Sequence, residues 1–387
     1  MIKYAHKILR LGIFSTALLL LSSATTWAQS TPRETAWKIH NRLVGVPPTP
    51  AVLQQMEQLI TANQTAAAAQ LAMENPLFYS VTLKNWIKKW TNIDQTNRVE
   101  LNDYTATVLG MIRDDIPFDT VLYGDHLYVL AADGNIPAYS NENNNHYREA
   151  EARKVDLKNN LVYRAQSQMN NIDDTAGVLT TRASGEAFFS AGTNRRVTRF
   201  TFMNFLCRDF ESLHDANVPD IYVRRDVERD PGGDSRTYRN SCVGCHAGQD
   251  ALGGAFAYFD YVGNRLVHNP DRVVPKMNLN NLFEDGHVVE DDSWVNLWHR
   301  GVNANLGFRG QQQGNGARTL GYMLARSQAF GQCMAKRVYE WVCLRSDDEA
   351  TDRTTLTELA TLFETNNQYN MKNLIAQTSA RCFGGSR

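Results

Sequence analysis

The chain has 387 residues, of which 43% are hydrophobic, and its 40 Lys and Arg are balanced by 41 Asp and Glu. The near-neutral charge gives no reason to expect nucleic acid or a strongly acidic molecule as a partner. The hydrophobic fraction is enough for a proper core, so we expect a globular protein, and the length suggests two or three structural units.

The first 28 residues have the three parts of a secretory signal peptide. Lys3, Lys7 and Arg10 give a basic start, residues 11–21 are apolar, and cleavage after Ala28 is acceptable. The alternative is an N-terminal membrane anchor, but the apolar run is short against the ~20 residues that a span needs. No later stretch is apolar enough to cross a bilayer. The sequence therefore predicts a periplasmic or secreted protein with no membrane span in the mature chain.

Residues 29–130 form a predicted helical region. One helix ends at the break Gly45-Val46-Pro47-Pro48, and the next begins with Thr49 as its cap and Pro50 in its first turn. A further helix over 75–92 carries an aromatic face, and another is capped by Asn102 or Asp103. Residues 131–175 are polar and rich in Asn, which predicts a long loop or an insertion.

Residues 176–318 form the predicted cofactor-bearing region. It begins with helix to about residue 215, continues as a polar loop, and reaches the stretch RNSCVGCHAGQD, which contains Cys242, Cys245 and His246. A thioredoxin-like dithiol needs a strand before the first Cys, whereas a polar loop precedes it here. A zinc site needs a second pair of ligands at similar spacing, and none follows. A disulfide between Cys242 and Cys245 would be small and strained.

The His that directly follows the second Cys is the feature that c-type haem attachment requires. The two thiols add across the haem vinyl groups, and His246 is then the proximal iron ligand. One such motif predicts one covalent haem c, and export agrees with this prediction because bacterial haem attachment takes place outside the cytoplasm.

Residues 319–387 are predicted to be helical, and they contain three of the four remaining cysteines. Cys333 and Cys343 lie on one amphipathic helix about 15 Å apart, beyond the ~7 Å that a disulfide allows between Cα atoms. Each must pair with Cys207 or Cys382, or remain free. We favour Cys207–Cys333 and Cys343–Cys382 over the swapped pairing, as structural disulfides.

Three segments, in order between about residues 35 and 345, resemble large bacterial cytochrome c-like proteins of the planctomycete type. They are NRLVGVPPTPAVLQQM, CVGCHAGQDALGGAFAYFD and CMAKRVYEWVCLR. In the second segment, the family positions after the motif are occupied by Asp250, Leu252, Gly253, Phe259 and Asp260. Gln249 and Ala251 differ from the residues that are usual in the family. The resemblance implies a haem protein and says little about a substrate. The expected fold is mainly α: a helical protein with an embedded cytochrome c-like haem segment and long loops.

The ligand on the far side of the iron decides between electron transfer and catalysis. Met277, in a loop beside Pro275, is the predicted distal ligand. Ordinary packing is the alternative for Met277, and His268, His287 and His299 are the other candidates. Two cations, Arg265 and Lys276, are candidate partners for a haem propionate, and four aromatic residues are candidates for the haem pocket or an electron relay: Tyr258, Tyr261, Trp294 and Trp298.

These observations predict an exported mono-haem c-type cytochrome that exchanges single electrons with a redox protein partner. The chain is larger than an electron carrier needs, so a haem enzyme of the peroxidase or oxidase kind, with an open or labile distal site, is the alternative. A haem subunit of an exported complex is a third hypothesis.

Overall fold

The computed structural model describes residues 30–131 and 134–384. The predicted signal peptide lies outside the described residues. The fold is mainly α, as the sequence predicts. The α-helices are α1 Pro32–Val44, α2 Pro50–Thr61, α3 Thr65–Met73, α4 Lys84–Lys88, α5 Asp103–Arg113, α6 Asn145–Ala152, α7 Leu157–Asn160, α8 Gln166–Asn170, α9 Arg182–Ser184, α10 Arg195–Thr201, α11 Ser235–Thr237, α12 Val243–Gly253, α13 Gly316–Ala325, α14 Gln328–Cys343, α15 Ala350–Thr361 and α16 Met371–Phe383.

The strands are short and pair only as three antiparallel two-stranded sheets in the described part of the chain. They are β1 Leu127–Leu130 with β2 Leu161–Arg164, β3 Phe259–Val262 with β4 Arg265–His268, and β5 Ser293–Val295 with β6 Gln313–Asn315. Several helices also begin or end in π-helical turns, including Phe202–Leu206 and Tyr238–Cys242.

The predicted helix boundaries near the N-terminus are confirmed. The Thr49 hydroxyl accepts from the Val52 N–H and Pro50 is the first residue of α2. At α5, the cap is Asn102, whose side-chain oxygen accepts from the Thr105 N–H at 2.9 Å. These boundaries are predictable because a cap satisfies its own helix within three residues.

Of the two alternatives predicted for 131–175, the long loop is wrong, because this interval holds α6, α7, β2 and α8, and the insertion stays a prediction. Within α6, His146, Tyr147 and Ala150 face the core. The carboxylate of Glu151 lies 2.8 Å from Lys84 Nζ and 2.5 Å from Lys88 Nζ, and so ties α6 to α4. The polar composition concealed a segment whose polar groups are satisfied by partners far away in the sequence.

The favoured disulfide pairing is confirmed. Cys207 pairs with Cys333 at a Cα–Cα distance of 5.2 Å, and Cys343 pairs with Cys382 at 5.5 Å. Since Cys333 and Cys343 both lie on α14, this one helix is joined to the end of the Phe202–Leu206 turn and to α16.

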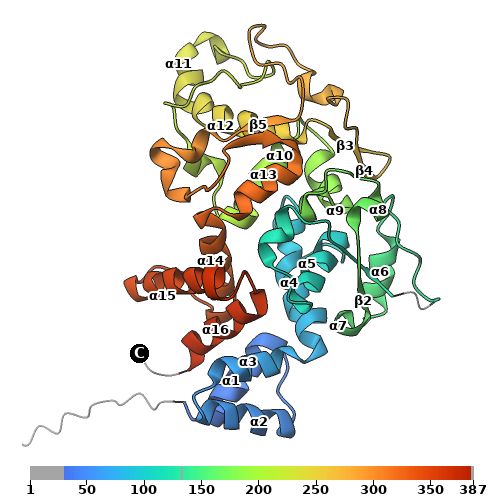
Figure 1. The fold of residues 1–387 in the computed structure, drawn as a ribbon, viewed down its shortest axis with the longest axis vertical. Coiled ribbons are helices and arrows are strands. Elements are labelled where there is room, and N and C mark those ends of the chain that lie inside the picture. The colour runs from blue at the N-terminus through green and yellow to red at the C-terminus, as the bar shows by residue number, and fades with distance from the viewer. Residues whose placement is uncertain (1–29, 132–133, 385–387) are drawn as a thin grey trace, which may run out of the picture.

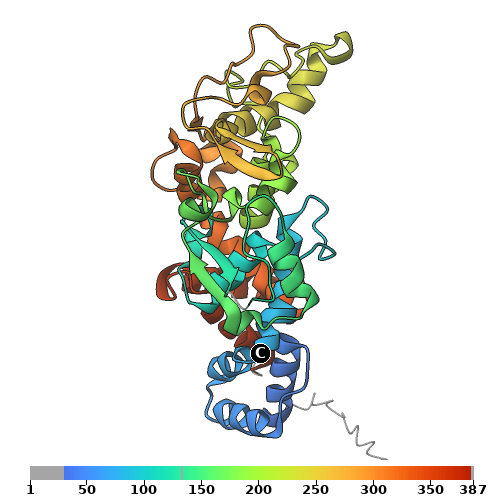
Figure 2. The same cartoon turned by 90° about the vertical axis from the view of Figure 1, so that its right-hand side faces the viewer.

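The molecule is elongated, and the N- and C-terminal helices lie at the opposite end from the Cys-x-x-Cys-His segment (Figure 1). At one end α16 packs against α1 and α3, so the first and last described helices lie together. At the other end lie α11 and α12 with the loops around them, and the view turned by 90° shows the same separation (Figure 2). None of the helices in 30–131 and 134–384 is both long and apolar enough to cross a membrane.

Candidate functional site

The Cys-x-x-Cys-His motif lies at the start of α12. The π-helical turn Tyr238–Cys242 leads directly into this helix, so no strand precedes the motif. Cys242, Cys245 and His246 are spaced i, i+3 and i+4 and therefore share one face of the helix. All three are half-buried, and the His246 side chain is 28% exposed. This face is therefore partly exposed.

The two thiols of the motif are unpaired, whereas the other four cysteines form disulfides. Burial raises the pKa of Cys245, with smaller contributions from nearby acidic groups that include Glu211, so its thiol is protonated at neutral pH. Its sulfur lies 3.4 Å from the carbonyl oxygen of Phe210. The site therefore offers two thiols and one imidazole on one surface.

One edge of the His246 ring faces the protein interior. Its Nδ1 is buried and makes no hydrogen bond. The nearest charged group is Asp250, one helical turn further along α12, whose Oδ2 lies 3.7 Å from Nδ1. The Nε2 edge lies on the far side of the ring from Asp250, and is the edge that an iron ion would bind. A ligating His whose second nitrogen faces a carboxylate is a common arrangement in metal sites.

Asp250 belongs to a buried cluster of two Asp and two Arg residues. Arg195 donates from Nε to Oδ1 at 2.6 Å and from Nη2 to Oδ2 at 2.8 Å. Arg224 donates its backbone N–H to Oδ2 at 3.1 Å and Nη2 to Oδ1 at 3.2 Å. Arg195 also forms a two-point ion pair with Asp226, at 2.6 and 2.7 Å.

Burial alone would raise the pKa of Asp250, but the charges of Arg224 and Arg195 and their hydrogen bonds outweigh burial and hold the pKa well below its usual value. The carboxylate is therefore ionised, and its position is fixed by donors from two other segments of the chain.

Met277, the predicted distal ligand, lies behind this cluster. Its side chain is 1% exposed and packs in a small apolar group with Ala257, Val274 and Val289. Its sulfur accepts from Arg224 Nη1 at 3.4 Å. Since Arg224 also contacts Asp250, Met277 lies on the Nδ1 side of His246, and the structure does not bring it to the Nε2 side. Its role as a ligand remains a prediction that would require residues around 277 to move.

The three alternative His ligands have other surroundings. His268 stacks on Phe259 with ring centroids 4.6 Å apart. His287 packs on Tyr222 and lines a cavity of about 370 Å³ that also reaches Asp250. Burial lowers the pKa of both His268 and His287, so neither carries a charge at neutral pH. Both ring nitrogens of His299 are engaged, Nδ1 with a backbone carbonyl and Nε2 with a neighbouring Arg side chain.

The predicted propionate partners have carboxylate partners of their own in this structure. Arg265 lies 3.1 Å from Glu142, and Lys276 lies 2.5 Å from Asp260. Of the four aromatic candidates, Trp294 donates to Thr319 and Tyr261 accepts from an Arg side chain, while Tyr258 lies near His268. Trp298 packs directly on α12 at Gly248.

Two close contacts on α12 were not predicted from the sequence. A Cβ atom at Gly248 would lie 2.1 Å from Trp298 Cε2, and a Cβ atom at Gly244 would lie 2.6 Å from the His214 ring. The Trp298 ring therefore lies directly against the helix backbone at Gly248, and the His214 ring lies against the motif itself at Gly244. Glycine at 248 is required by this approach because Trp298 is fully buried, whereas a side chain at 244 would displace the exposed ring of His214. The only sequence signal for these two contacts is a glycine within a helical segment, and a glycine does not indicate which side chain packs against it.

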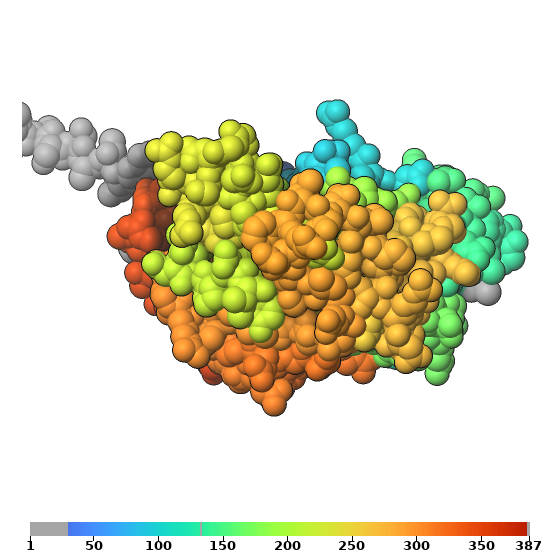
Figure 3. Space-filling view, turned by 90° about the horizontal axis from the view of Figure 1, so that it is seen from above, coloured from blue at the N-terminus to red at the C-terminus, as the bar shows by residue number. Residues whose placement is uncertain are grey.

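The site occupies the end of the molecule seen in Figure 3. Two segments form this end, one around residues 220–245 in yellow and one around 270–305 in orange. They are joined by backbone hydrogen bonds from Leu282 to the Arg225 carbonyl and from His287 to the Val223 carbonyl.

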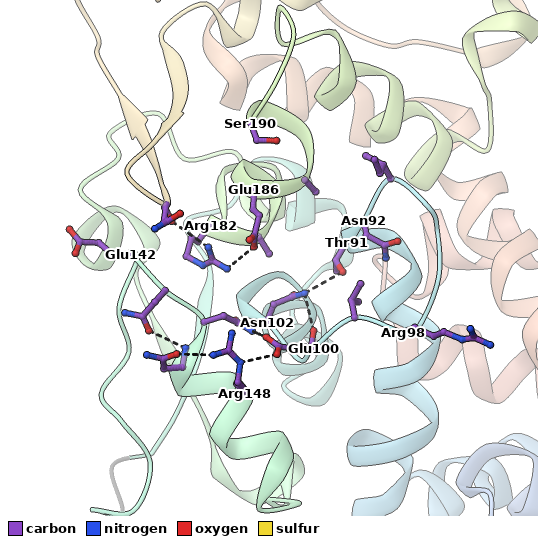
Figure 4. A pocket seen from close by; sticks show the side chains of 18 of the residues that line it. Thr91, Asn92, Arg98, Glu100, Asn102, Glu142, Arg148, Arg182, Glu186 and Ser190 are labelled. Carbon is purple, nitrogen blue, oxygen red and sulfur yellow. Dashed lines mark hydrogen bonds and ion pairs between the residues drawn. The ribbon is translucent and has the colours of Figure 1, made fainter.

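A larger cavity, of about 600 Å³, lies elsewhere, between the segment 91–102 that precedes α5, the start of α6, and α9 with the turn after it (Figure 4). Its wall contains the ion pairs Arg148–Glu100, at 2.8 Å, and Arg182–Glu186, at 2.7 Å. No residue of the motif lines it. Its charged, internally paired wall does not match an apolar macrocycle, so size alone does not identify the functional site.

Within the described residues, no three His, Cys, Asp or Glu side chains are grouped so as to hold a metal ion. A haem iron needs no such group, since the porphyrin supplies four of its ligands. Comparisons with protein-family models, with curated proteins and with solved structures found no match.

Proposed function

We propose that this protein is an exported mono-haem c-type cytochrome that exchanges single electrons with a redox protein partner. One observation carries the proposal. Of six cysteines, four are joined in disulfides, and the two that stay free lie beside His246 on one face of α12. A chance Cys-x-x-Cys-His sequence would not require its two thiols to be spared from pairing.

The residues present fit a covalently attached haem. In the attachment step each S–H adds across a vinyl double bond, which forms one C–S and one C–H bond, so no oxidant is consumed. Cys242 and Cys245 provide these anchors, and His246 provides the proximal nitrogen. The bound group supplies an iron that changes oxidation state by one electron.

Export and a protein partner are supported by two further features. Two disulfides are typical of an oxidising compartment outside the cytoplasm. On the loops at the site end, Ile221, Leu279, Leu282 and Val302 are each more than 60% exposed. Exposed apolar side chains at this end are candidate contacts for a partner.

The test is the absorption spectrum of the reduced protein, purified from the periplasm of a host that attaches c-type haem. We expect a c-type spectrum, and haem that stays on the polypeptide after denaturation. A Cys242→Ser/Cys245→Ser variant is expected to lose the covalent haem. Wild-type protein that carries no covalent haem would disprove the proposal.

A haem enzyme is the second candidate, and the position of Met277 favours it. The Met277 sulfur contacts Arg224 on the Nδ1 side of His246, so no methionine from this segment faces the Nε2 side. Carbon monoxide distinguishes the candidates. If it leaves the reduced spectrum unchanged, the iron is firmly six-coordinate and electron transfer is supported. If it binds readily, the distal position is open or labile and the enzyme is supported.

A further inference from the structure

We propose that Asp250 is a positioning residue that accepts a hydrogen bond from His246 Nδ1 in the haem-bound protein, and that it thereby sets the orientation of His246 and lowers the reduction potential of the iron. The inference rests on the proposed function, because it concerns the ligand of that haem. It assigns a role to a residue that does not touch the haem itself.

The geometry leaves His246 Nδ1 with one suitable acceptor. This nitrogen is buried and unpartnered, and the side chain of Asp250 is fully buried beside it. Their separation of 3.7 Å is about 0.8–1.0 Å longer than a charge-assisted N–H···O bond, which is about 2.7–2.9 Å long. The hydrogen bond therefore requires the imidazole to move toward Asp250 by that distance when haem binds, and the i,i+4 spacing on α12 keeps both groups on one side of the helix.

The acceptor is held in place by other parts of the fold. Arg195 lies at the start of α10, and Arg224 lies in the loop before α11. Together they donate four hydrogen bonds to the two oxygens of Asp250. Oδ2 already accepts from Arg195 Nη2 and from the Arg224 N–H, so His246 would take the place of the longer bond, the one from the Arg224 N–H at 3.1 Å. Asp250 cannot turn away from the imidazole without breaking these contacts.

The charge of the acceptor gives the second effect. A carboxylate that accepts from a ligating His makes this ligand more basic than a backbone carbonyl would. A more basic ligand favours Fe(III) over Fe(II), so the potential falls. The two Arg and two Asp of the cluster sum to no net charge, which limits the size of the effect without removing the hydrogen bond.

A purely structural role for Asp250 is the competing explanation, since its ion pairs join α12 to α10. Asp226 is the matched control, because it pairs with Arg195 in the same cluster and has no contact with His246. A structural role predicts that Asp250→Asn and Asp226→Asn change the protein in the same way. The proposed role predicts that only Asp250→Asn changes the bond between iron and His246.

The experiment compares purified haem-loaded wild type, Asp250→Asn and Asp226→Asn. Where the iron binds carbon monoxide, the iron–histidine stretching frequency is measured by resonance Raman spectroscopy of the reduced protein after photolysis; where the iron stays six-coordinate, the reduction potential of the three proteins is the readout. We expect a lower frequency in Asp250→Asn and the wild-type frequency in Asp226→Asn. We also expect Asp250→Asn to be about tenfold more reduced at a given potential, which is a rise of about 59 mV for one electron. Equal frequencies in all three proteins would overturn the inference.

Two measurements cover a failure of Asp250→Asn to fold. The double variant Asp250→Asn/Arg224→Met removes one charge of each sign and leaves the Arg195–Asp226 pair, and we expect the same lower frequency from it. In unaltered reduced protein, either six-coordinate as purified or made so with carbon monoxide, NMR of ¹⁵N-histidine should show a downfield, slowly exchanging Nδ1 proton on His246. Its absence would overturn the inference. Wild type without any haem would instead disprove the proposed function.

Discussion

Replacement of Gly248 by Ala tests the packing that supports the motif helix. A Cβ atom there would lie 2.1 Å from Trp298 Cε2 and 2.4 Å from Nε1, where ordinary contacts begin near 3.4 Å. Trp298 cannot give way, because it is fully buried and its ring centroid lies 5.5 Å from that of Phe202 and 5.2 Å from that of Phe210.

The expected magnitude follows from two opposing effects. Overpacking a core costs about 1–3 kcal/mol, and a contact this short belongs at the upper end of that range. Alanine in place of glycine inside a helix stabilises the helix by up to about 1 kcal/mol, because its helix propensity is higher. We therefore expect Gly248→Ala to lower the free energy of unfolding by about 2 kcal/mol.

Gly253, on the same helix, provides the control. Its backbone is helical (φ −67°, ψ −15°), and a Cβ atom would have its nearest contacts at 3.8 Å. Gly253→Ala should therefore be neutral or stabilise by up to about 1 kcal/mol. Both variants are unfolded by guanidinium under non-reducing conditions and followed by far-ultraviolet circular dichroism. Equal stability of the two variants, within about 0.5 kcal/mol, would refute the reasoning.

Three further predictions concern other parts of the molecule. Burial opposes ionisation of Glu151, but the hydrogen bonds from two Lys residues prevail and lower its pKa from 4.5 to about 2. Its stabilisation is therefore present above pH 4.5 and lost as the pH falls towards 2. Allowing for partial exposure, Glu151→Gln should lower the free energy of unfolding by about 2 kcal/mol at pH 7. In denaturant unfolding, the difference in this free energy between wild type and variant should shrink between pH 5 and 3, and a constant difference would contradict this. Cys207→Ser/Cys333→Ser opens a 126-residue loop and should lower the free energy of unfolding by about 3 kcal/mol in the same assay, whereas an unchanged midpoint would argue against a bond that stabilises the fold. Met277→Ala should leave the visible spectrum of the reduced haem protein unchanged, since its sulfur contacts Arg224 here; a shifted spectrum would show instead that Met277 reaches the iron.

Local signals made much of the helical framework predictable. The cap and first residue of α2 and the cap of α5 are satisfied within three residues of themselves, so the sequence carries the whole signal. The disulfide pairing was predictable in part, because helical rise alone excludes a Cys333–Cys343 bond. The choice between the two remaining pairings depends on the tertiary fold.

The support of the motif was not predictable, because it comes from distant segments. Asp250 lies at a readable i,i+4 spacing from His246, but Arg195 is 55 and Arg224 is 26 residues away from Asp250. Neither Arg has a local pattern that marks it as buried. Met277 had a favourable spacing from the motif, yet spacing cannot show which side of His246 a loop will reach.

The two disulfides on α14 also determine how the protein would respond to tension. If the ends of the chain are pulled apart, the covalent route runs from Cys207 through Cys333 and Cys343 to Cys382. Residues 208–332, which include the whole motif helix, form a loop closed by the Cys207–Cys333 disulfide, so the pulling force does not pass through them. A single proteolytic cut anywhere within that loop would likewise leave one covalent molecule.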